Sequence, residues 1–209
     1  MSAKKDIADQ FYVWFDTEYS DLELDTARLL QVAALITDRS LKRVLPAEQD
    51  VRLTIRLPDE AVLSPWVVQN LPELVKACRS AEAVEIEEAD MRLASCVDAV
   101  AGLPAEQENQ RPVLAGNSLH ADWWLARRFL PRFLSRLHYR HLDVTALKLQ
   151  WMRLHPDVEF EKENPEIIRR YFPESVLPVS GRRHDAYYDV HASIAELAFY
   201  RRFLLREEV

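Results

Sequence analysis

A chain of 209 residues of which 48% are hydrophobic has the size and apolar content of one large α/β domain. Its net charge of −7 argues against a protein that binds nucleic acid through a long series of basic contacts to phosphates. Three glycines are too few for either common glycine-rich phosphate loop, and no apolar run reaches the roughly 18 residues of a membrane span.

The N-terminal residues and the two cysteines favour the cytoplasm as the compartment. Residues 1–10 (MSAKKDIADQ) contain lysines but no apolar segment of a secretory signal, and we expect them to be flexible. Cys78 and Cys96 are not spaced as metal ligands. We therefore expect a cytoplasmic protein with reduced thiols.

Residues 11–57 are expected to form a meander of three strands. Residues 11–16 and 28–37 are apolar runs, and VRLTIRL at 51–57 alternates apolar and polar residues as a half-buried strand does. The first run leads directly into Asp16, Thr17 and Glu18.

Asp16 and Glu18 are the first candidates for chemistry. Because side chains alternate along a strand, the two carboxylates point to the same side. Two such groups at the end of a buried strand repel each other and lose hydration unless a cation joins them. A divalent metal such as Mg²⁺ prefers carboxylate oxygen and would remove that cost. Alternatively, the acids only mark the point at which the strand enters solvent.

After residue 57 the pattern changes to helices that alternate with short strands, which predicts a mixed sheet surrounded by helices. Ser64 and Pro65 predict a helix start, and Pro72 should break or restart that helix. Further helices are expected at 82–100, at 122–137 with a kink at Pro131, at 145–154, near 165–172 within a long loop, and, as an amphipathic helix, at 184–206; short strands are expected at 112–118 and 141–144.

Three later motifs carry the remaining candidate residues. Asp122 ends GNSLHAD, HYRHLD at 138–143 is a basic and aromatic cluster, and His184 begins HDAYYD, five residues before Asp189. Taken singly, Asp122 is a favourable acid at a helix N-terminus, Asp189 a solvated helix residue and His184 a surface or capping histidine. A separate pattern, arginines at every fourth position, forms either a basic stripe or a solvated helix face: Arg128, Arg132, Arg136 and Arg140.

Together these motifs resemble the DEDDh exonucleases, and within them the oligoribonucleases. The segments VLAGNSLHAD, LPRFLSRLHYRHLDVTALK and HDAYYDVHASIAELAFYR match that family in order, and the likeness extends from about Phe11 to Phe203. It implies an RNase H-like α/β fold with a central mixed five-stranded sheet flanked by helices, in one exonuclease domain spanning residues 1–209. It also implies a homodimeric 3′–5′ exoribonuclease that uses two Mg²⁺ or Mn²⁺ ions and hydrolyses short single-stranded oligoribonucleotides to nucleoside 5′-monophosphates.

The resemblance also implies the roles of individual residues. The metal carboxylates would be Asp16, Glu18, Asp122 and Asp189, and His184 would be the general base. Five residues of helix turn by about 500°, so His184 and Asp189 cannot share a helix face, and His184 is expected on the loop before the helix. The expected substrate contacts are Leu22 against a base, Trp66 along the nucleotides, Ser118, Arg140 and Thr145 at the 5′ phosphate, and Tyr139 from a second subunit. For Trp66 and Tyr139 the alternative is core packing.

Several departures from the family pattern leave alternatives open. Tyr19, Ser20 and Asp21 stand where the family has Met-Thr-Gly, Leu71 replaces a histidine that contacts phosphate, and the loop 155–183 is longer. A strict preference for dinucleotides is therefore open. One alternative is a related exonuclease that trims 3′ ends of single-stranded DNA or RNA, and another is a non-catalytic homologue that binds nucleic acid. A helical interaction module would not explain the buried strand that ends in two acids.

Overall fold

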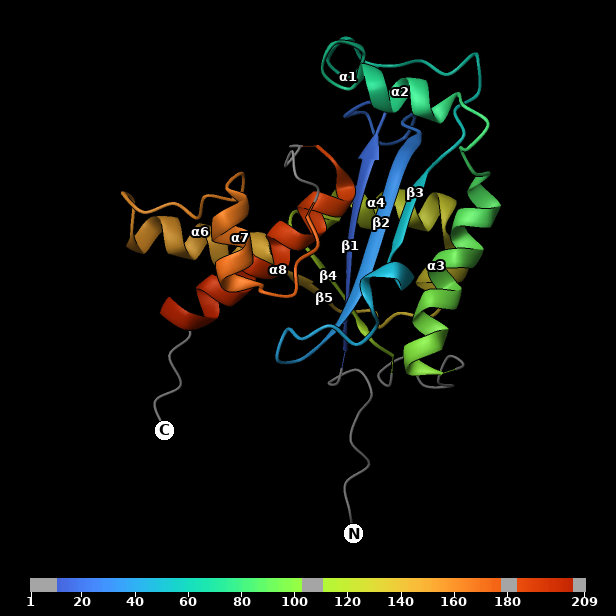
Figure 1. The fold of residues 1–209 in the computed structure, drawn as a ribbon. Coiled ribbons are helices and arrows are strands. Elements are labelled where there is room, and N and C mark those ends of the chain that lie inside the picture. Colours follow the sequence, from blue (N-terminus) through green and yellow to red (C-terminus); the bar gives the residue numbers. More distant parts are fainter. Residues whose placement is uncertain (1–10, 103–110, 178–183, 205–209) are drawn as a thin grey trace.

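The computed structural model describes residues 11–102, 111–177 and 184–204, and its centre is the expected mixed five-stranded sheet (Figure 1). Residues 1–10, which were expected to be flexible, lie outside the described part. The strand order is β3-β2-β1-β4-β5. The strands are β1 (Phe11–Tyr19), β2 (Leu29–Asp38), β3 (Val51–Thr54), β4 (Val113–Gly116) and β5 (His141–Asp143).

Strand directions decide where functional side chains can meet. β1 to β3 form the antiparallel meander, whereas β4 pairs parallel to β1, with Val13 opposite Leu114, and β5 pairs parallel to β4. Parallel strands require crossover connections, which helices provide here. The carboxyl ends of β1, β4 and β5 therefore lie at one edge of the sheet.

Helices cover both faces of the sheet. One face packs against α3 (Ile86–Ala101), α4 (Leu119–Phe129) and α5 (Pro131–Leu134), and the other against α6 (Val144–Leu154), α7 (Pro165–Tyr171) and α8 (Ala186–Phe203). Because side chains alternate, Val13 and Phe15 belong to the first core and Trp14 to the second. Above the ends of β1 and β2 lie α1 (Pro65–Asn70) and α2 (Pro72–Cys78) (Figure 1); a 3₁₀ turn (Ala47–Gln49) precedes β3.

Several predicted helix boundaries are confirmed by local geometry. Ser64 accepts a hydrogen bond from the Val67 backbone N–H at 3.3 Å, and Pro72 starts a second helix as expected. Gly102 ends α3 with a positive φ of 76°. The expected kink at Pro131 is a complete break, because proline removes a backbone donor and clashes with the preceding turn. α3 begins at Ile86, four residues later than expected.

The expected amphipathic character of the last helix is wrong. Thirteen of the 18 residues of α8 are buried, including His191 and Glu196. The reason is tertiary: α7, which forms within the long loop, packs together with α6 against α8, while the sheet covers its other side. A helix enclosed in this way has no solvated face to impose a polar stripe.

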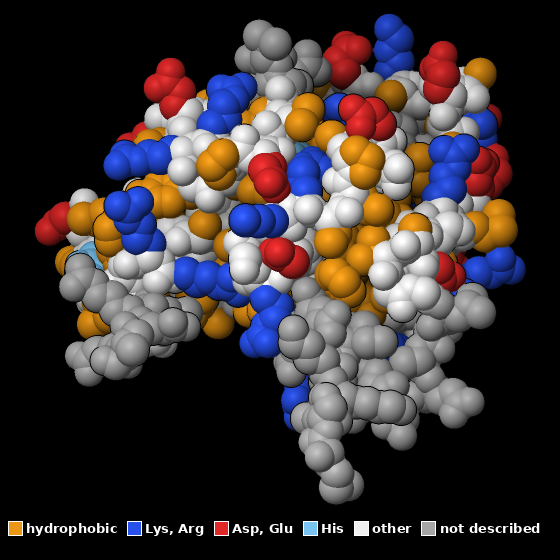
Figure 2. All heavy atoms as spheres, turned by 60° about the horizontal axis from the view of Figure 1, so that its bottom comes forward, with side chains coloured by type: hydrophobic (Ala, Val, Ile, Leu, Met, Phe, Trp, Pro, Cys, Tyr) orange, Lys and Arg blue, Asp and Glu red, His pale blue; other side chains and the backbone are white. Residues whose placement is uncertain are grey.

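The four arginines spaced every fourth residue do not form a basic stripe. The helix that would carry them ends at Phe129, and Arg128 donates to the backbone oxygen of Asp25 at 2.5 Å. Arg136 pairs with Asp98 at 3.1 Å. On the face that comes forward in Figure 2, basic and acidic side chains are interspersed with apolar ones.

Within the described residues no helix is both long and apolar enough to cross a membrane.

Candidate active site

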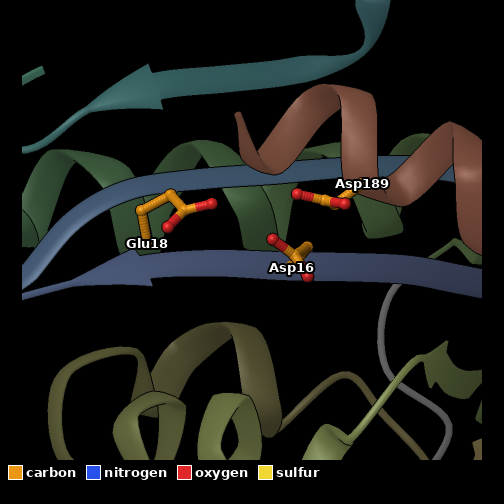
Figure 3. Close-up of side chains that lie close together, drawn as sticks. All are labelled: Asp16, Glu18 and Asp189. Carbon is orange, nitrogen blue, oxygen red and sulfur yellow. The ribbon is translucent and has the colours of Figure 1, made fainter. Parts of the chain in front are cut away.

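Three acidic side chains meet where β1 faces α8. Asp16 and Glu18 lie on the face of β1 that α8 covers, and Asp189 lies in the first turn of α8. Figure 3 shows the three side chains pointing toward one another, and each offers a carboxylate oxygen within 4.8 Å of the others. Oxygen ligands at this spacing could hold a divalent cation.

The fourth predicted acid, Asp122, lies outside this group of three but lines the same cavity. It sits in the first turn of α4, which starts after the carboxyl end of β4, and it is 5% exposed. The Thr17 hydroxyl donates to Asp122 Oδ1 at 2.7 Å, which fixes the carboxylate beside β1. The positive end of the helix dipole also favours an acid at this position.

Crowding and burial make negative charge unfavourable at three of these carboxyl groups, those of Asp16, Glu18 and Asp122. Burial, and then the charges of Asp122, Asp189 and Glu18, hold the pKa of Asp16 well above its usual range. Burial and the Asp189 charge raise the pKa of Glu18 to about 8. Burial raises the pKa of Asp122 to about 7, although the hydrogen bond from Thr17 opposes that shift. A set of crowded oxygen donors that repel one another suits a divalent cation, which would compensate the charge.

His184 precedes α8, as the sequence predicts, and lines the cavity that holds the acids. Its backbone has a φ of 61°, the left-handed region that few residues other than glycine adopt. Its ring meets that of Trp66 edge to face, with ring centroids 4.9 Å apart. The segment after it is fixed: Asp185 caps α8 and pairs with Arg52 at 2.5 Å, and Gln31 accepts from the Ala186 backbone N–H at 2.8 Å.

The cavity has a volume of about 730 Å³ and brings the predicted base-contacting residues to the acids. Leu22 and Trp66 line it and are 86% and 47% exposed, so core packing does not explain Trp66. At the carboxyl end of β4, Ser118 also lines it. The cavity therefore presents metal-ligand candidates, a histidine and two exposed apolar side chains to the same bound molecule.

Ser118 and Thr145, predicted to meet a terminal phosphate, are in direct contact. The Ser118 N–H donates to Thr145 Oγ1 at 2.8 Å and to Asp143 Oδ1 at 3.0 Å. Asn117 supports the pair, because its Oδ1 accepts from Thr145 and its Nδ2 donates to buried Glu196 at 2.8 Å. No role was predicted for Asn117, Asp143 or Glu196, although the three segments that resemble the oligoribonucleases contain them.

Arg140 and Tyr139 are not among the residues that line this cavity. They precede β5 at its amino end, whereas the acids lie at the carboxyl ends of the parallel strands. Tyr139 is 60% exposed, so core packing does not explain it, and the Arg140 guanidinium lies 5.2 Å from the centre of its ring. The contact of Arg140 with the 5′ phosphate and the contact of Tyr139 from a second subunit remain predictions.

The departures from the family pattern leave the backbone unstrained. The described residues with positive φ are Leu41, Gly102, Ser118 and His184, so the turn at 19–22 does not need the glycine that it lacks. Ser20 holds this turn, since its hydroxyl accepts from the Arg28 N–H at 2.9 Å. Leu71, which replaces the family's histidine, is buried against Leu30 and Val67 and offers no polar group.

Lys162, for which the sequence predicted no role, also lines the cavity. Its Nζ lies 3.8 Å from Asp189 Oδ1. The residue belongs to the segment between α6 and α7, and no motif in that segment points to it. The chain has 27 lysines and arginines, and nothing in the sequence around Lys162 distinguishes it from the others as a residue of the cavity.

The chain is similar in sequence to known nucleases. The chain matches the family described as Exonuclease over residues 13–197. It is 29% identical to the mitochondrial oligoribonuclease of Bos taurus over 218 residues, which covers all of this chain and 78% of that protein. It is 30% identical to an oligoribonuclease of Francisella tularensis, covering 92% of this chain and 95% of the relative, and 32% identical to that of Mycobacterium bovis, covering 91% and 79%.

Solved structures show the same fold at lower identity. Exonuclease I of Methylocaldum szegediense matches 94% of this chain with a TM-score of 0.65 and 18% identity. Exonuclease I of E. coli, solved in complex with a 5cy-dT13 oligonucleotide, matches 95% with a TM-score of 0.61 and 15% identity. The chain spans about two fifths of those solved chains (41% and 42%). This likeness confirms the expected RNase H-like fold.

Proposed function

We propose that this chain, which belongs to the exonuclease family and resembles its oligoribonucleases, is a metal-dependent 3′–5′ exonuclease. It hydrolyses short single-stranded oligoribonucleotides to nucleoside 5′-monophosphates. The observation that carries the proposal is the cavity that Asp16, Glu18, Asp122, Asp189 and His184 line together. These side chains come from two helices, a strand and a loop, so their common position is a property of the fold.

The four acids would hold two Mg²⁺ or Mn²⁺ ions. Their mutual repulsion and burial support this assignment, because two divalent ions would offset four carboxylate charges. When bound, such ions activate water and stabilise the leaving 3′-oxygen of a phosphodiester. Thr17 would hold the Asp122 carboxylate at the site, since the Thr17 hydroxyl donates to it.

His184 would act as the general base that takes a proton from the attacking water. An imidazole titrates near neutral pH and therefore suits this role. It lies on the segment before α8, beside the exposed indole of Trp66 and at the cavity, where it would be next to a bound nucleotide. Gln31 and Arg52 restrain the following residues and thereby the direction of the histidine.

The cavity suits a short substrate. Its volume of about 730 Å³ falls within the range of roughly 300–1,000 Å³ for pockets that enclose a small ligand. Leu22 and Trp66 would contact the bases, and Ser118 and Thr145 would bind the 5′ phosphate, with Arg140 and, from a second subunit, Tyr139. A contact at the 5′ phosphate would limit the length of oligonucleotide that fits.

The protein would function as a cytoplasmic homodimer. Tyr139 and Arg140 are exposed and do not line the cavity of their own chain, which supports a site completed across a two-fold axis. Cys78 and Cys96 are free thiols, which supports a reducing compartment. Because some relatives are mitochondrial, cell fractionation would test the compartment.

A time course on 5′-labelled RNA of two to ten nucleotides, with Mg²⁺, Mn²⁺ or EDTA, tests the function. We expect loss of nucleotides from the 3′ end with either metal, fastest on the shortest RNA, and none with EDTA. Equal or faster cleavage of the longest RNA or of DNA would favour the exonuclease that trims single-stranded ends. Tight binding without cleavage would favour the non-catalytic homologue.

A further inference from the structure

The segment between α6 and α7 brings a positive charge into the candidate active site. Lys162 lines the cavity, and its Nζ lies 3.8 Å from Asp189 Oδ1. Among the described residues that line the cavity there is no other lysine or arginine. Lys162 is also close enough to Asp16 and Glu18 for its charge to lower their pKa values against the stronger effect of burial.

The backbone of Lys162 is anchored, so the lysine reaches the site because of the fold. Its carbonyl oxygen accepts from the Tyr188 hydroxyl at 3.0 Å, and its N–H donates to the Phe160 carbonyl at 2.9 Å. Phe160 is itself buried against α8. Trp151 of α6 ties down the same segment by donating to the Val158 carbonyl at 2.6 Å.

The charges of the site leave a role for one ammonium group. The four proposed ligand carboxylates and two divalent cations sum to zero, while Asp21, which also lines the cavity, adds one negative charge. A bound phosphodiester would therefore leave the site with a net negative charge that a cation could offset. A lysine offers three donors on a flexible stem and binds phosphate as a point charge. We propose that Lys162 binds the scissile phosphate of the oligonucleotide, an inference that rests on the proposed exonuclease function.

A simple surface ion pair is the competing explanation. The Lys162 side chain is 39% exposed, and ion pairs in solvent contribute little to stability. The chain contains a matched example: Lys148 of α6 lies 3.8 Å from Glu159 Oε1, is 28% exposed and does not line the cavity. A lysine that binds substrate and a lysine in a surface pair should therefore respond differently to the same substitution.

The experiment compares Lys162→Met and Lys148→Met with wild type in the presence of Mn²⁺. The ligands are short RNAs whose 3′-terminal linkage is either a charged phosphorothioate or a neutral methylphosphonate, and binding is measured by fluorescence anisotropy. We expect Lys162→Met to lose about tenfold of the wild-type preference for the charged linkage, the effect of one charge-assisted hydrogen bond. Its plot of log affinity against log salt should become shallower by about 0.7, the value for one phosphate contact to a single strand.

Two controls separate this effect from damage to the protein. Lys162→Arg keeps the charge and should retain most of the preference. Mn²⁺ binding without RNA, followed by the loss of the free-ion electron paramagnetic resonance signal, should be unchanged or tighter in Lys162→Met, because a nearby cation is removed. Circular dichroism and the melting temperature report folding.

If Lys162→Met keeps the wild-type linkage preference and salt dependence, as Lys148→Met is expected to do, Lys162 is a surface ion-pair partner and the inference is wrong. Wild type would still degrade short RNA in that case, and the proposed function would stand. If wild type neither binds nor cleaves short RNA with metal, the proposed function fails and the inference fails with it.

Discussion

The crowded acids of the candidate active site are expected to destabilise the metal-free protein. Glu18 and Asp122 have pKa values of about 8 and 7 in the fold, above their ordinary values of 4.5 and 3.8. At a pH between the ordinary and the raised pKa values, the folded protein keeps protons that the unfolded chain has released. The free energy of unfolding therefore falls as the pH rises. The penalty is absent below pH 4 and complete above pH 8.

We therefore predict that the melting temperature in EDTA is lower at pH 8.5 than at pH 5.5, and that Mn²⁺ reverses most of the difference. Asp16→Asn should abolish exonuclease activity and raise the metal-free melting temperature at pH 8.5 by about 2–4 °C, corresponding to about 1 kcal/mol. Differential scanning calorimetry measures the melting temperatures, and cleavage of 5′-labelled RNA measures the activity. Asp59→Asn, at an exposed acid outside the cavity, is the control. Near-normal activity of Asp16→Asn would remove Asp16 from the metal site.

His184→Ala should lower kcat by roughly 10²–10⁴-fold, the usual effect of losing general acid–base catalysis. Metal affinity should change little, because the acids remain. The acid limb of the pH–rate profile should disappear, as a group that must lose its proton is removed. His120→Ala is the matched control, since His120 lines the same cavity without an assigned role. A variant of His184 that keeps the acid limb would show that another group is the base.

At this scale the sequence predicted residues that share a motif or a strand. Strand alternation alone placed Asp16 and Glu18 on one side, and the fixed spacing of His184 and Asp189 placed the histidine before the helix. Lys162 and Arg52 could not be found in this way. Lys162 lines the cavity and Arg52 pairs with Asp185, the residue after His184, and both come from segments far along the chain. Only tertiary packing decides which of the many charged residues take such positions.

At the scale of elements, the start of α8 carries a positioning device for His184. Asp185 caps the helix by accepting from the N–H groups of Tyr187 and Tyr188, and its other carboxylate oxygen pairs with Arg52 of β3 at 2.5 Å. The Arg52 guanidinium also lies over the Tyr187 ring, 5.6 Å from its centre. Removing Arg52 would leave the cap and the Gln31 hydrogen bond in place but would loosen Asp185, the residue after His184.

Arg52→Met should therefore lower kcat by about tenfold with little change in KM, because small misplacements of a catalytic group are costly. The apparent pKa of the acid limb should move, which a purely structural ion pair would not cause. Arg52→Lys, which keeps the charge, should restore part of kcat. Steady-state kinetics from pH 5 to pH 9 provide the test. An unchanged acid limb in Arg52→Met would mean that Gln31 and Trp66 position the histidine without it.

Element boundaries were predictable where one residue decides them. Ser64 caps α1, Pro72 starts α2 and Gly102 ends α3 because each acts on its own backbone. The environment of an element was not predictable in the same way. The burial of α8 depends on α7, a short helix that packs on it from a loop, and no local pattern in 184–206 reports that cover.

At the scale of the whole molecule, the positions of Tyr139 and Arg140 bear on whether one chain or two chains build the site. Both lie before β5, away from the cavity of their own chain, and Tyr139 is 60% exposed. In a homodimer with a two-fold axis, the same surface serves both protomers and every substitution occurs twice. Tyr139 could then complete the neighbour's site, and a mixture of two inactive variants distinguishes this arrangement from a site built by one chain.

We predict that Tyr139→Ala and Asp16→Asn homodimers have little activity and that mixing them restores some. In a heterodimer, one site has both an intact acid cluster and an intact tyrosine, while the other has neither. Random exchange makes half of the dimers mixed, so activity per protomer should recover to about a quarter of wild type. Sedimentation gives the oligomeric state, and exchange between differently tagged protomers shows that mixing occurred. Proven exchange without recovery, or a monomer, would leave Trp66 and Leu22 to hold the substrate within one chain, and would favour oligonucleotides longer than two residues.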